Sequence, residues 1–199
     1  MESQSIYDSL TWYCPPADYT TSATTLTVKT APSTDYWRKT HYGFIRDNGH
    51  FFNKHTEGDF EATVSFQGKY RDLYDQAGFM IRFDEKVWLK CGIEYYKGKR
   101  NASTVVTNDH SDWSVTPLND MPEDGWFQLK IVWQRPAVEV FYRVDDSHEW
   151  SMMRLAYLIA PEEVKTVQFG LMACSPDGTG FEVEFKDFKV GPLSKAEQH

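Results

Sequence analysis

The segment around residue 90 carries the polar side chains with the clearest potential for chemistry. Trp88, Lys90 and Glu94 share one face if the segment is a strand, because side chains an even number of positions apart point the same way. A carboxylate beside an ammonium group can hold a ligand or act as a general acid or base. The same pair can be an ion pair on a polar strand face, and we favour binding or structure over catalysis for it.

Three segments share one pattern, a glycine in the middle of a face that also carries an aromatic residue or methionine and isolated polar groups. The three faces are Gln76, Gly78, Met80 and Arg82; Trp88, Lys90, Gly92 and Glu94; and Gln168, Gly170, Met172 and Cys174. Glycine inside a strand marks a place where something approaches the backbone closely. Rings with a few polar groups suit a sugar or polyol. We expect the three strands to lie side by side, and two interpretations of their shared face remain open: a groove for such a ligand, or a sheet covered by one of the chain's own loops, which would bury Trp88 and Met80.

Residues 35–50 are dense in groups that recognise polar ligands. His41, His50 and His55 could suggest a metal, but their spacing matches no ligand motif and no Cys or Asp cluster accompanies them, so we expect no metal and no other cofactor. A hairpin with the Asn-Gly pair at 48–49 as its tight turn explains the segment more simply.

The elements that must position these residues are short strands. Turn signals recur about every eight to twelve residues, and the segments between them alternate apolar and polar side chains with period two. The clearest apolar sets are Phe60, Ala62, Val64 and Phe66; Phe127, Leu129, Ile131 and Trp133; Val138, Val140, Tyr142 and Val144; and Val167, Phe169, Leu171 and Ala173. This pattern predicts an all-β fold, a two-sheet antiparallel β-sandwich of jelly-roll type that forms one domain over residues 1–193, with a flexible tail at 194–199.

Composition excludes several classes of protein. The 199 residues include 16% aromatic residues, which excludes a disordered chain. The net charge of −8 and the lack of a basic run argue against nucleic acid, and no apolar stretch approaches the ~18 residues that cross a membrane. The first residues carry no basic and apolar leader. Cys14, Cys91 and Cys174 fit neither a disulfide framework nor a zinc motif, so we expect free thiols and a cytoplasmic location.

Several strings, taken in order, resemble one family. They are Tyr36-Trp37-Arg38, Asn48-Gly49-His50, Tyr74-Asp75-Gln76-Ala77-Gly78, Trp88-Leu89-Lys90-Cys91-Gly92-Ile93-Glu94, Ser111-Asp112-Trp113-Ser114, Gly170-Leu171-Met172-Ala173-Cys174-Ser175-Pro176 and Phe185-Lys186-Asp187-Phe188. Over nearly the whole chain, the sequence resembles the regulation-of-enolase protein family, a domain-of-unknown-function family in the concanavalin A-like lectin/glucanase superfamily. The resemblance implies a concave sheet, the surface on which superfamily relatives bind or cleave glycans, and a role in controlling enolase by protein contact. Fold analogy alone supplies no function without a site.

The resemblance also implies where a ligand would bind. The concave-sheet positions are Gln76, Arg82, Trp88, Lys90 and Glu94, and the rim positions are Trp37, Arg38, His50 and Trp113. The chain lacks the Glu-x-Asp-x-Glu signature of the glucanases, because Lys186 stands where a third acid would be needed. We therefore expect a non-catalytic cytoplasmic regulator of carbohydrate metabolism, with enolase and a small carbohydrate-like ligand as its partners. The alternative is a carbohydrate-active enzyme that uses Glu94 as acid/base near Arg82 or His50.

Overall fold

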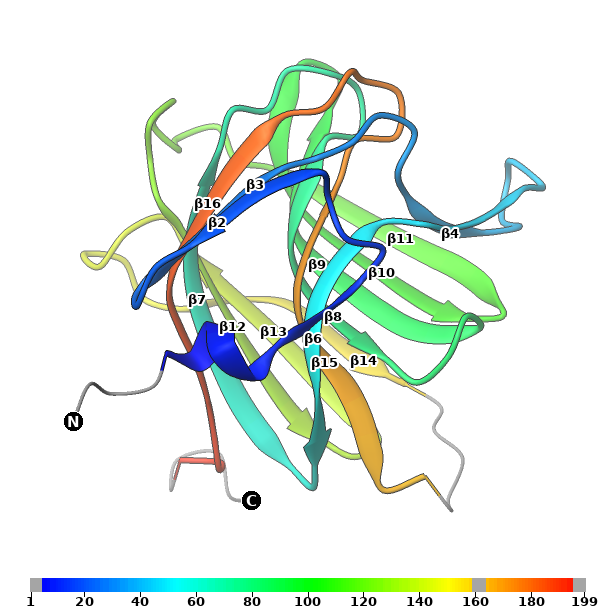
Figure 1. Ribbon diagram of the computed structural model, residues 1–199, viewed down its shortest axis with the longest axis vertical. Helices are drawn as coiled ribbons and strands as arrows, with labels where there is room; N and C mark the ends of the chain where they lie inside the picture. Colours follow the sequence, from blue (N-terminus) through cyan, green and yellow to red (C-terminus); the bar gives the residue numbers. More distant parts are fainter. Residues whose placement is uncertain (1–4, 159–163, 195–199) are drawn as a thin grey trace.

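The computed structural model describes residues 5–158 and 164–194, and these residues form two seven-stranded antiparallel sheets packed face to face (Figure 1). The predicted all-β, two-sheet sandwich is therefore confirmed. Of the predicted tail at 194–199, only Ser194 lies within the described residues, and its backbone N–H donates to Glu61 Oε2 at 3.2 Å.

Consecutive strands often share a sheet. Sheet A contains, from edge to edge, β1 (Thr11–Tyr13), β6 (His50–Glu57), β15 (Thr166–Cys174), β8 (Gln76–Arg82), β9 (Val87–Tyr96), β10 (Lys99–Asn108) and β11 (His110–Pro117). Sheet B contains β14 (Ser151–Tyr157), β13 (Ala137–Arg143), β12 (Phe127–Gln134), β7 (Phe60–Gly68), β16 (Glu182–Gly191), β3 (Thr25–Lys29) and β2 (Asp18–Thr21). Thus β8 to β11 follow one another in sheet A, and β12 to β14 do so in sheet B. A short 3-10 helix, η1 (Ile6–Ser9), precedes β1, and β4 (Tyr36–Arg38) pairs with β5 (Ile45–Asp47) as a separate hairpin.

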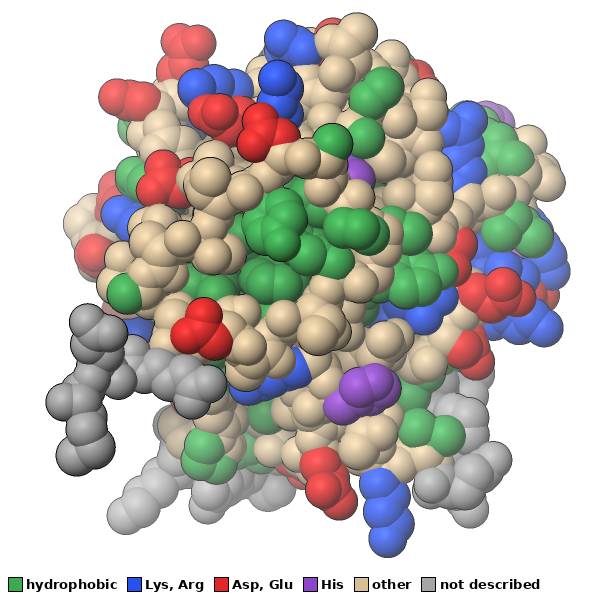
Figure 2. All heavy atoms as spheres, in the orientation of Figure 1, with side chains coloured by type: hydrophobic (Ala, Val, Ile, Leu, Met, Phe, Trp, Pro, Cys, Tyr) green, Lys and Arg blue, Asp and Glu red, His purple; other side chains and the backbone are tan. Residues whose placement is uncertain are grey.

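The core lies between the two sheets and contains the apolar sets that the alternation predicts. Phe60 of sheet B meets Phe169 of sheet A with ring centroids 4.7 Å apart, and Phe169 contacts Phe79 at 5.1 Å. Complete burial of one such side chain stabilises a fold by roughly 1.5–3 kcal/mol. Figure 2 shows hydrophobic side chains in the gap between the sheets on the viewed face. Trp12 of β1 helps to close one edge of the sandwich, because it stacks on Phe52 and meets Tyr19 of β2 edge-on.

The three glycine-bearing segments are the adjacent strands β15, β8 and β9, as the sequence pattern suggested. Gly78 lies directly opposite Gly92, with φ values of +157° and +151°. A Cβ atom on Gly92 would lie 2.1 Å from the carbonyl oxygen of Ala77, which belongs to the facing strand. The glycine pair therefore allows two backbones in the middle of sheet A to approach more closely than side chains would permit.

Candidate functional site

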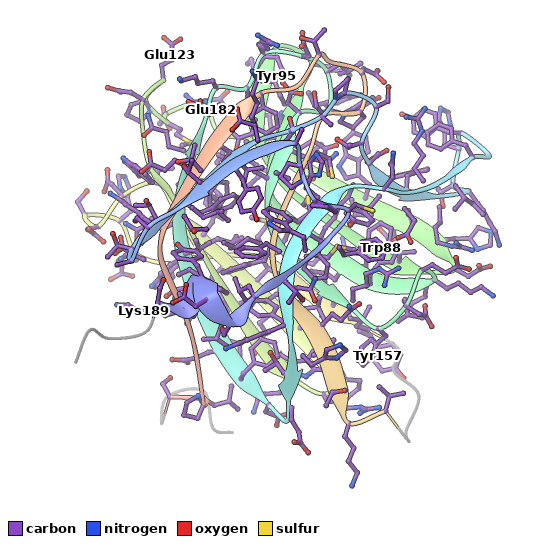
Figure 3. All side chains as sticks on the ribbon, viewed as in Figure 1. Trp88, Tyr95, Glu123, Tyr157, Glu182 and Lys189 are labelled. Carbon is purple, nitrogen blue, oxygen red and sulfur yellow. The ribbon has the colours of Figure 1, made fainter. Side chains whose placement is uncertain are left out.

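The outer face of sheet A is largely covered by the β4–β5 hairpin. Between the hairpin and the sheet is a second hydrophobic cluster, separate from the main core, to which the hairpin contributes Tyr36 and Trp37 and sheet A contributes Phe51, Met80, Trp88, Val105, Met172 and Cys174. Trp88 is 1% exposed and meets Tyr36 edge-on at 6.0 Å (Figure 3). The chain's own side chains thus fill much of the predicted groove, and the covered-sheet interpretation describes this part of the face.

The hairpin turns at residues 39–44, so the predicted tight turn at Asn48-Gly49 is wrong. Lys39 N–H donates to the carbonyl of Phe44 at 2.8 Å, and three residues of the turn have a left-handed backbone: Lys39, His41 and Gly43. Asn48 and Gly49 instead follow β5, where both backbone N–H groups donate to the carbonyl of Asp35 at 3.1 Å. The Asn-Gly pair therefore joins the two ends of the hairpin, where β5 leads into β6.

The partly exposed Lys39 pairs with Asp109 at 2.6 Å, and three ion pairs with buried cations also fasten the hairpin to sheet A and its connecting loops. They are Arg38–Asp109 at 3.0 Å, Arg82–Asp47 at 2.9 Å and Lys90–Asp35 at 3.3 Å. Each of these three cationic side chains is almost fully buried, and a buried charge is tolerated only when it is paired. Hydrogen bonds from Lys39 and Arg38 lower the pKa of Asp109 to about 2.

Four of the nine predicted site residues lie outside the remaining cavity. Arg38 and Arg82 hold the hairpin through their ion pairs, and Trp88 lies beneath it. His50 Nε2 accepts from Ala31 N–H at 2.9 Å, while its Nδ1 lies 2.7 Å from the carbonyl oxygen of Cys14. These two partners require a neutral ring that donates from Nδ1, and burial lowers the pKa of His50.

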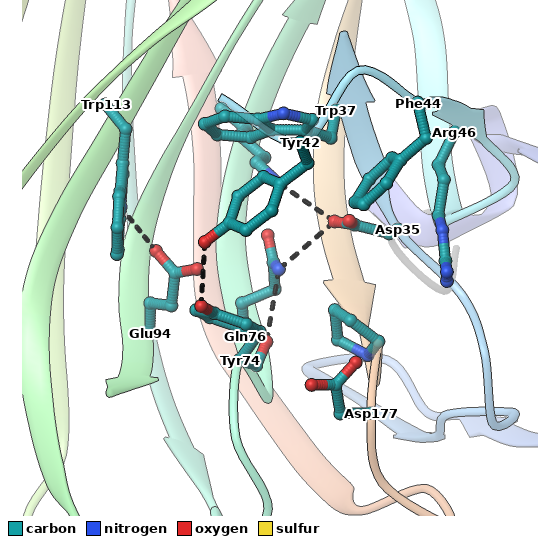
Figure 4. Close-up of a pocket in the computed structure, with 12 residues that line it drawn as sticks. Asp35, Trp37, Tyr42, Phe44, Arg46, Tyr74, Gln76, Glu94, Trp113 and Asp177 are labelled. Carbon is teal, nitrogen blue, oxygen red and sulfur yellow. Dashed lines mark hydrogen bonds and ion pairs between the residues drawn. The ribbon is translucent and has the colours of Figure 1, made fainter. Parts of the chain in front are cut away.

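A pocket of about 230 Å³ remains beside the hairpin, at the end of sheet A that carries Gln76 and Glu94 (Figure 4). Five predicted residues line it: Trp37, Gln76, Lys90, Glu94 and Trp113. The other lining residues were not among the predicted site residues; they are Asp35, Tyr42, Phe44, Arg46, Tyr74, Pro176 and Asp177. The first four of these residues lie in the segment 35–50, whose many polar and aromatic residues indicated recognition of a polar ligand. No sequence pattern connects that segment to Tyr74 or to the loop at 176–177.

Asp35 organises one part of the pocket floor. Its Oδ1 accepts hydrogen bonds from Tyr36 N–H at 2.8 Å, Lys90 Nζ at 3.3 Å and Gln76 Nε2 at 3.4 Å. Lys90 also donates to the carbonyl of Tyr36 at 2.7 Å. The Lys90 ammonium is thus held between a carboxylate and a carbonyl of the hairpin, and Asp35 offsets its charge.

Glu94 forms the other part of the floor. Its Oε2 accepts from Ser103 Oγ at 2.6 Å and from the indole N–H of Trp113 at 2.8 Å. Burial raises the pKa of Glu94 and outweighs the opposing effects of the Lys90 ammonium and the two hydrogen bonds. The carboxyl group of Glu94 therefore keeps its proton to a higher pH than that of an exposed glutamate.

Aromatic rings form the walls. Trp37 and Trp113 lie at 90° to each other with centroids 6.5 Å apart, and Tyr42 meets Trp37 edge-on at 5.6 Å. The hydroxyl groups of Tyr42 and Tyr74 are 2.9 Å apart and share a hydrogen bond (Figure 4). Tyr42 and Phe44 are 45% and 38% exposed, so they present their rings at the mouth of the pocket.

The described residues contain no cluster of three or more His, Cys, Asp or Glu side chains that could hold a metal ion. Cys14, Cys91 and Cys174 are free thiols. Across residues 5–158 and 164–194, no helix is long and apolar enough to cross a membrane.

The two-sheet arrangement is that of the concanavalin A-like sandwiches. The metal-free form of lectin I-B4 from Griffonia simplicifolia matches the structure with a TM-score of 0.62 at 10% identity, covering 96% of this chain and 95% of the lectin. At that identity, the likeness concerns the fold alone.

Residues 12–193 match the family described as "Protein of unknown function (DUF1349)", and the chain belongs to this family. It is 37% identical over 194 residues to "Regulation of enolase protein 1" of Saccharomyces cerevisiae, which covers 94% of this chain and 91% of the relative. A crystal structure of a functionally unknown protein from Saccharomyces cerevisiae matches with a TM-score of 0.87 at 35% identity, over 94% of this chain and 99% of that one. The resemblance seen in the sequence strings is therefore confirmed.

Proposed function

We propose that this protein is a non-catalytic, cytoplasmic regulator of carbohydrate metabolism that binds a sugar-like small molecule in the hairpin pocket and acts through contact with enolase. The observation that supports ligand binding is the pocket itself, which combines three carboxyl groups, an amide, an ammonium and a guanidinium group with walls of aromatic rings. The enolase half is supported by the name of the yeast relative.

The chemistry of the pocket suits a hydroxylated ring. Trp37 and Trp113 offer ring faces to its C–H bonds, while Gln76, Asp35 and Glu94 can fix its hydroxyl groups. The volume of about 230 Å³ is smaller than the roughly 300 Å³ at which pockets for drug-sized ligands begin. A single sugar ring therefore fits this site better than an oligosaccharide.

Ligand binding can be tested by thermal unfolding in the presence of monosaccharides, because a ligand that binds only the folded state raises the melting temperature by an amount that grows with the logarithm of its concentration relative to Kd. Tyr42→Ala removes an exposed ring at the pocket mouth, and Tyr157→Ala removes an exposed ring from β14 as a matched control. We expect the sugar-dependent rise to persist in Tyr157→Ala and to be lost in Tyr42→Ala. If no monosaccharide raises the melting temperature of the unmodified protein, or if Tyr42→Ala responds fully, the ligand half is wrong.

The enolase half needs a separate test. Purified enolase and this protein should associate in an equilibrium binding measurement, and a sugar that occupies the pocket should change the affinity if the two events are coupled. Absence of association, with and without sugar, would reject the enolase half and leave the ligand half standing.

The raised pKa of Glu94 favours a second candidate, an acid/base enzyme acting on a sugar. Arg82 and His50, which were expected beside Glu94, bind Asp47 and the Cys14 carbonyl instead. The other carboxyl groups that line the pocket are Asp35 and Asp177. Turnover of a sugar phosphate or oligosaccharide that disappears in Glu94→Gln would establish this candidate. No turnover across a broad panel of such substrates would reject it.

A further inference from the structure

We infer that the ring taken by the hairpin pocket carries a protonated amino group, which makes the ligand an amino sugar or a related amino polyol. The inference rests on the proposed ligand pocket and adds the charge of its occupant. It follows from an inventory of the hydrogen-bonding atoms that line the pocket, taken one residue at a time.

Gln76 presents its oxygen to a ligand. Its Nε2 donates to Asp35 Oδ1 at 3.4 Å and to the carbonyl of Tyr74 at 3.1 Å. Both partners can only accept, so the amide must turn its NH₂ group toward them, and both of its N–H bonds are used. The remaining polar atom of the side chain is Oε1, an acceptor.

The two carboxyl groups are bonded on one side only. Every hydrogen bond that the described residues make to the Glu94 side chain reaches Oε2, and every one to the Asp35 side chain reaches Oδ1. The other oxygen of Asp35 remains an acceptor for a ligand, and the other oxygen of Glu94 is an acceptor when this carboxyl group is ionised, the form that a bound cation would favour. Figure 4 shows Glu94 and Asp35 on either side of Gln76, with the amide between the two carboxyl groups.

The aromatic walls contribute ring faces and no spare indole donor. Trp113 Nε1 donates to Glu94, and Trp37 Nε1 donates to the carbonyl of Thr40 at 2.9 Å. Tyr42 and Tyr74 share one hydrogen bond, which leaves a single hydroxyl hydrogen between them. Ring faces attract cations because their π-electron clouds are negative.

The charges lining the pocket also favour a cation. Inside it, the carboxylate of Asp35 and, when ionised, that of Glu94 face one ammonium, and Lys90 has already placed two of its three N–H bonds on Asp35 and the Tyr36 carbonyl. The remaining charged lining residues are Arg46 and Asp177, one of each sign, so they do not change the balance. Arg46 lies over the ring of Phe44, 4.9 Å from its centroid.

An ammonium group matches this inventory better than a hydroxyl. It brings three N–H donors and a positive charge to a site that offers three acceptor atoms, whereas a hydroxyl brings one donor. Hydrogen bonds to charged groups are roughly twice as strong as neutral ones. A phosphate group, in contrast, would place further negative charge beside Asp35 and Glu94.

Calorimetric titration of the full chain with D-glucosamine, D-glucose and D-glucose 6-phosphate tests the inference. We expect glucosamine to bind about tenfold more tightly than glucose, as one added charge-assisted hydrogen bond would provide, and the phosphate to bind more weakly than either. Glu94→Gln should reduce the preference for glucosamine while glucose still binds. Glu184→Gln, on sheet B, should leave the preference unchanged.

Each outcome decides between the two proposals. If glucose binds as tightly as glucosamine, the amino group is not recognised and the inference is wrong, although the sugar pocket stands. If none of the three probes binds, the proposed ligand function fails as well. The ratio measured on the unmodified protein is decisive even if Glu94→Gln does not fold, and a preference that persists in a folded Glu94→Gln would also overturn the inference.

Discussion

Replacing Asp35 by alanine removes the carboxylate that fixes the hairpin and one part of the pocket floor. In the folded protein, Asp35 Oδ1 lies 3.3 Å from Lys90 Nζ and 3.4 Å from Gln76 Nε2. The Lys90 side chain is only 5% exposed, so water cannot replace the lost partner fully. The substitution would leave a buried ammonium group whose remaining partner is the Tyr36 carbonyl at 2.7 Å.

The expected loss of stability follows from this geometry. Removing one partner of a buried ion pair costs about 3–5 kcal/mol, because the other charge stays buried without compensation. Lys90 keeps its hydrogen bond to the Tyr36 carbonyl, so we expect a loss near the lower limit, about 3 kcal/mol. In a chain of this length, that loss corresponds to a decrease in melting temperature of roughly 6–12 °C.

Urea unfolding of a double-mutant cycle is the assay. The variants are Asp35→Ala, Lys90→Met and the two combined. Because the combined variant contains no unpaired charge, it should be more stable than the sum of the two single losses predicts, by at least about 1 kcal/mol. Additive losses, or a loss below about 1 kcal/mol for Asp35→Ala, would refute the claim that this pair fixes the covered face.

Three further predictions concern single positions. Gly92→Ala should destabilise the fold by about 1–3 kcal/mol in urea unfolding, because its Cβ would meet the facing backbone at 2.1 Å. Gly191→Ala, whose Cβ would have no atom within 4 Å, should be nearly neutral. Equal effects of the two substitutions would contradict the close approach of the two backbones at Gly92. The fold raises the pKa of Glu94, so the folded protein keeps this proton where the unfolded chain has lost it, and the contribution of Glu94 to stability falls as the pH rises through that interval. Glu94→Gln should therefore gain stability relative to the unmodified protein as the pH rises above the ordinary glutamate value of about 4.3, and a constant difference in urea unfolding would argue against it. The pKa of His50 is lowered, so its contribution to stability is complete above the unfolded value near 6.5 and is lost as the pH falls below it. An NMR titration should place the midpoint of this ring below about 6.5, and a midpoint at or above that value would contradict the buried, neutral imidazole.

The alternation of apolar and polar residues in the sequence was sufficient to predict which side chains face the core. Ala77, Phe79 and Ile81 belong to the core between the sheets, while Met80 belongs to the separate cluster under the hairpin. A strand exposes alternate residues on opposite faces, so one long apolar alternation defines both faces at once. The adjacency of the three glycine-bearing strands also followed, because their faces share the same composition.

What covers a face cannot be read from its alternation. Arg82 and Trp88 are on the predicted face, but the hairpin lies over them, and its placement depends on ion pairs between residues far apart in the sequence. Asp35 illustrates the problem, because its partner Lys90 is 55 positions away. Tyr74 and Asp177 reach the same pocket from separate loops. Such tertiary placements have no local periodic signal.

The most direct test of the ligand pocket follows the indole N–H signals of the seven tryptophans by NMR while D-glucosamine is added. Trp37 and Trp113 line the pocket, and Trp133 is buried in the core between the sheets. We predict that the signals of Trp37 and Trp113 shift together and saturate at one ligand concentration, while the signal of Trp133 does not move. A Trp113 signal that stays in place at saturating sugar would contradict the account.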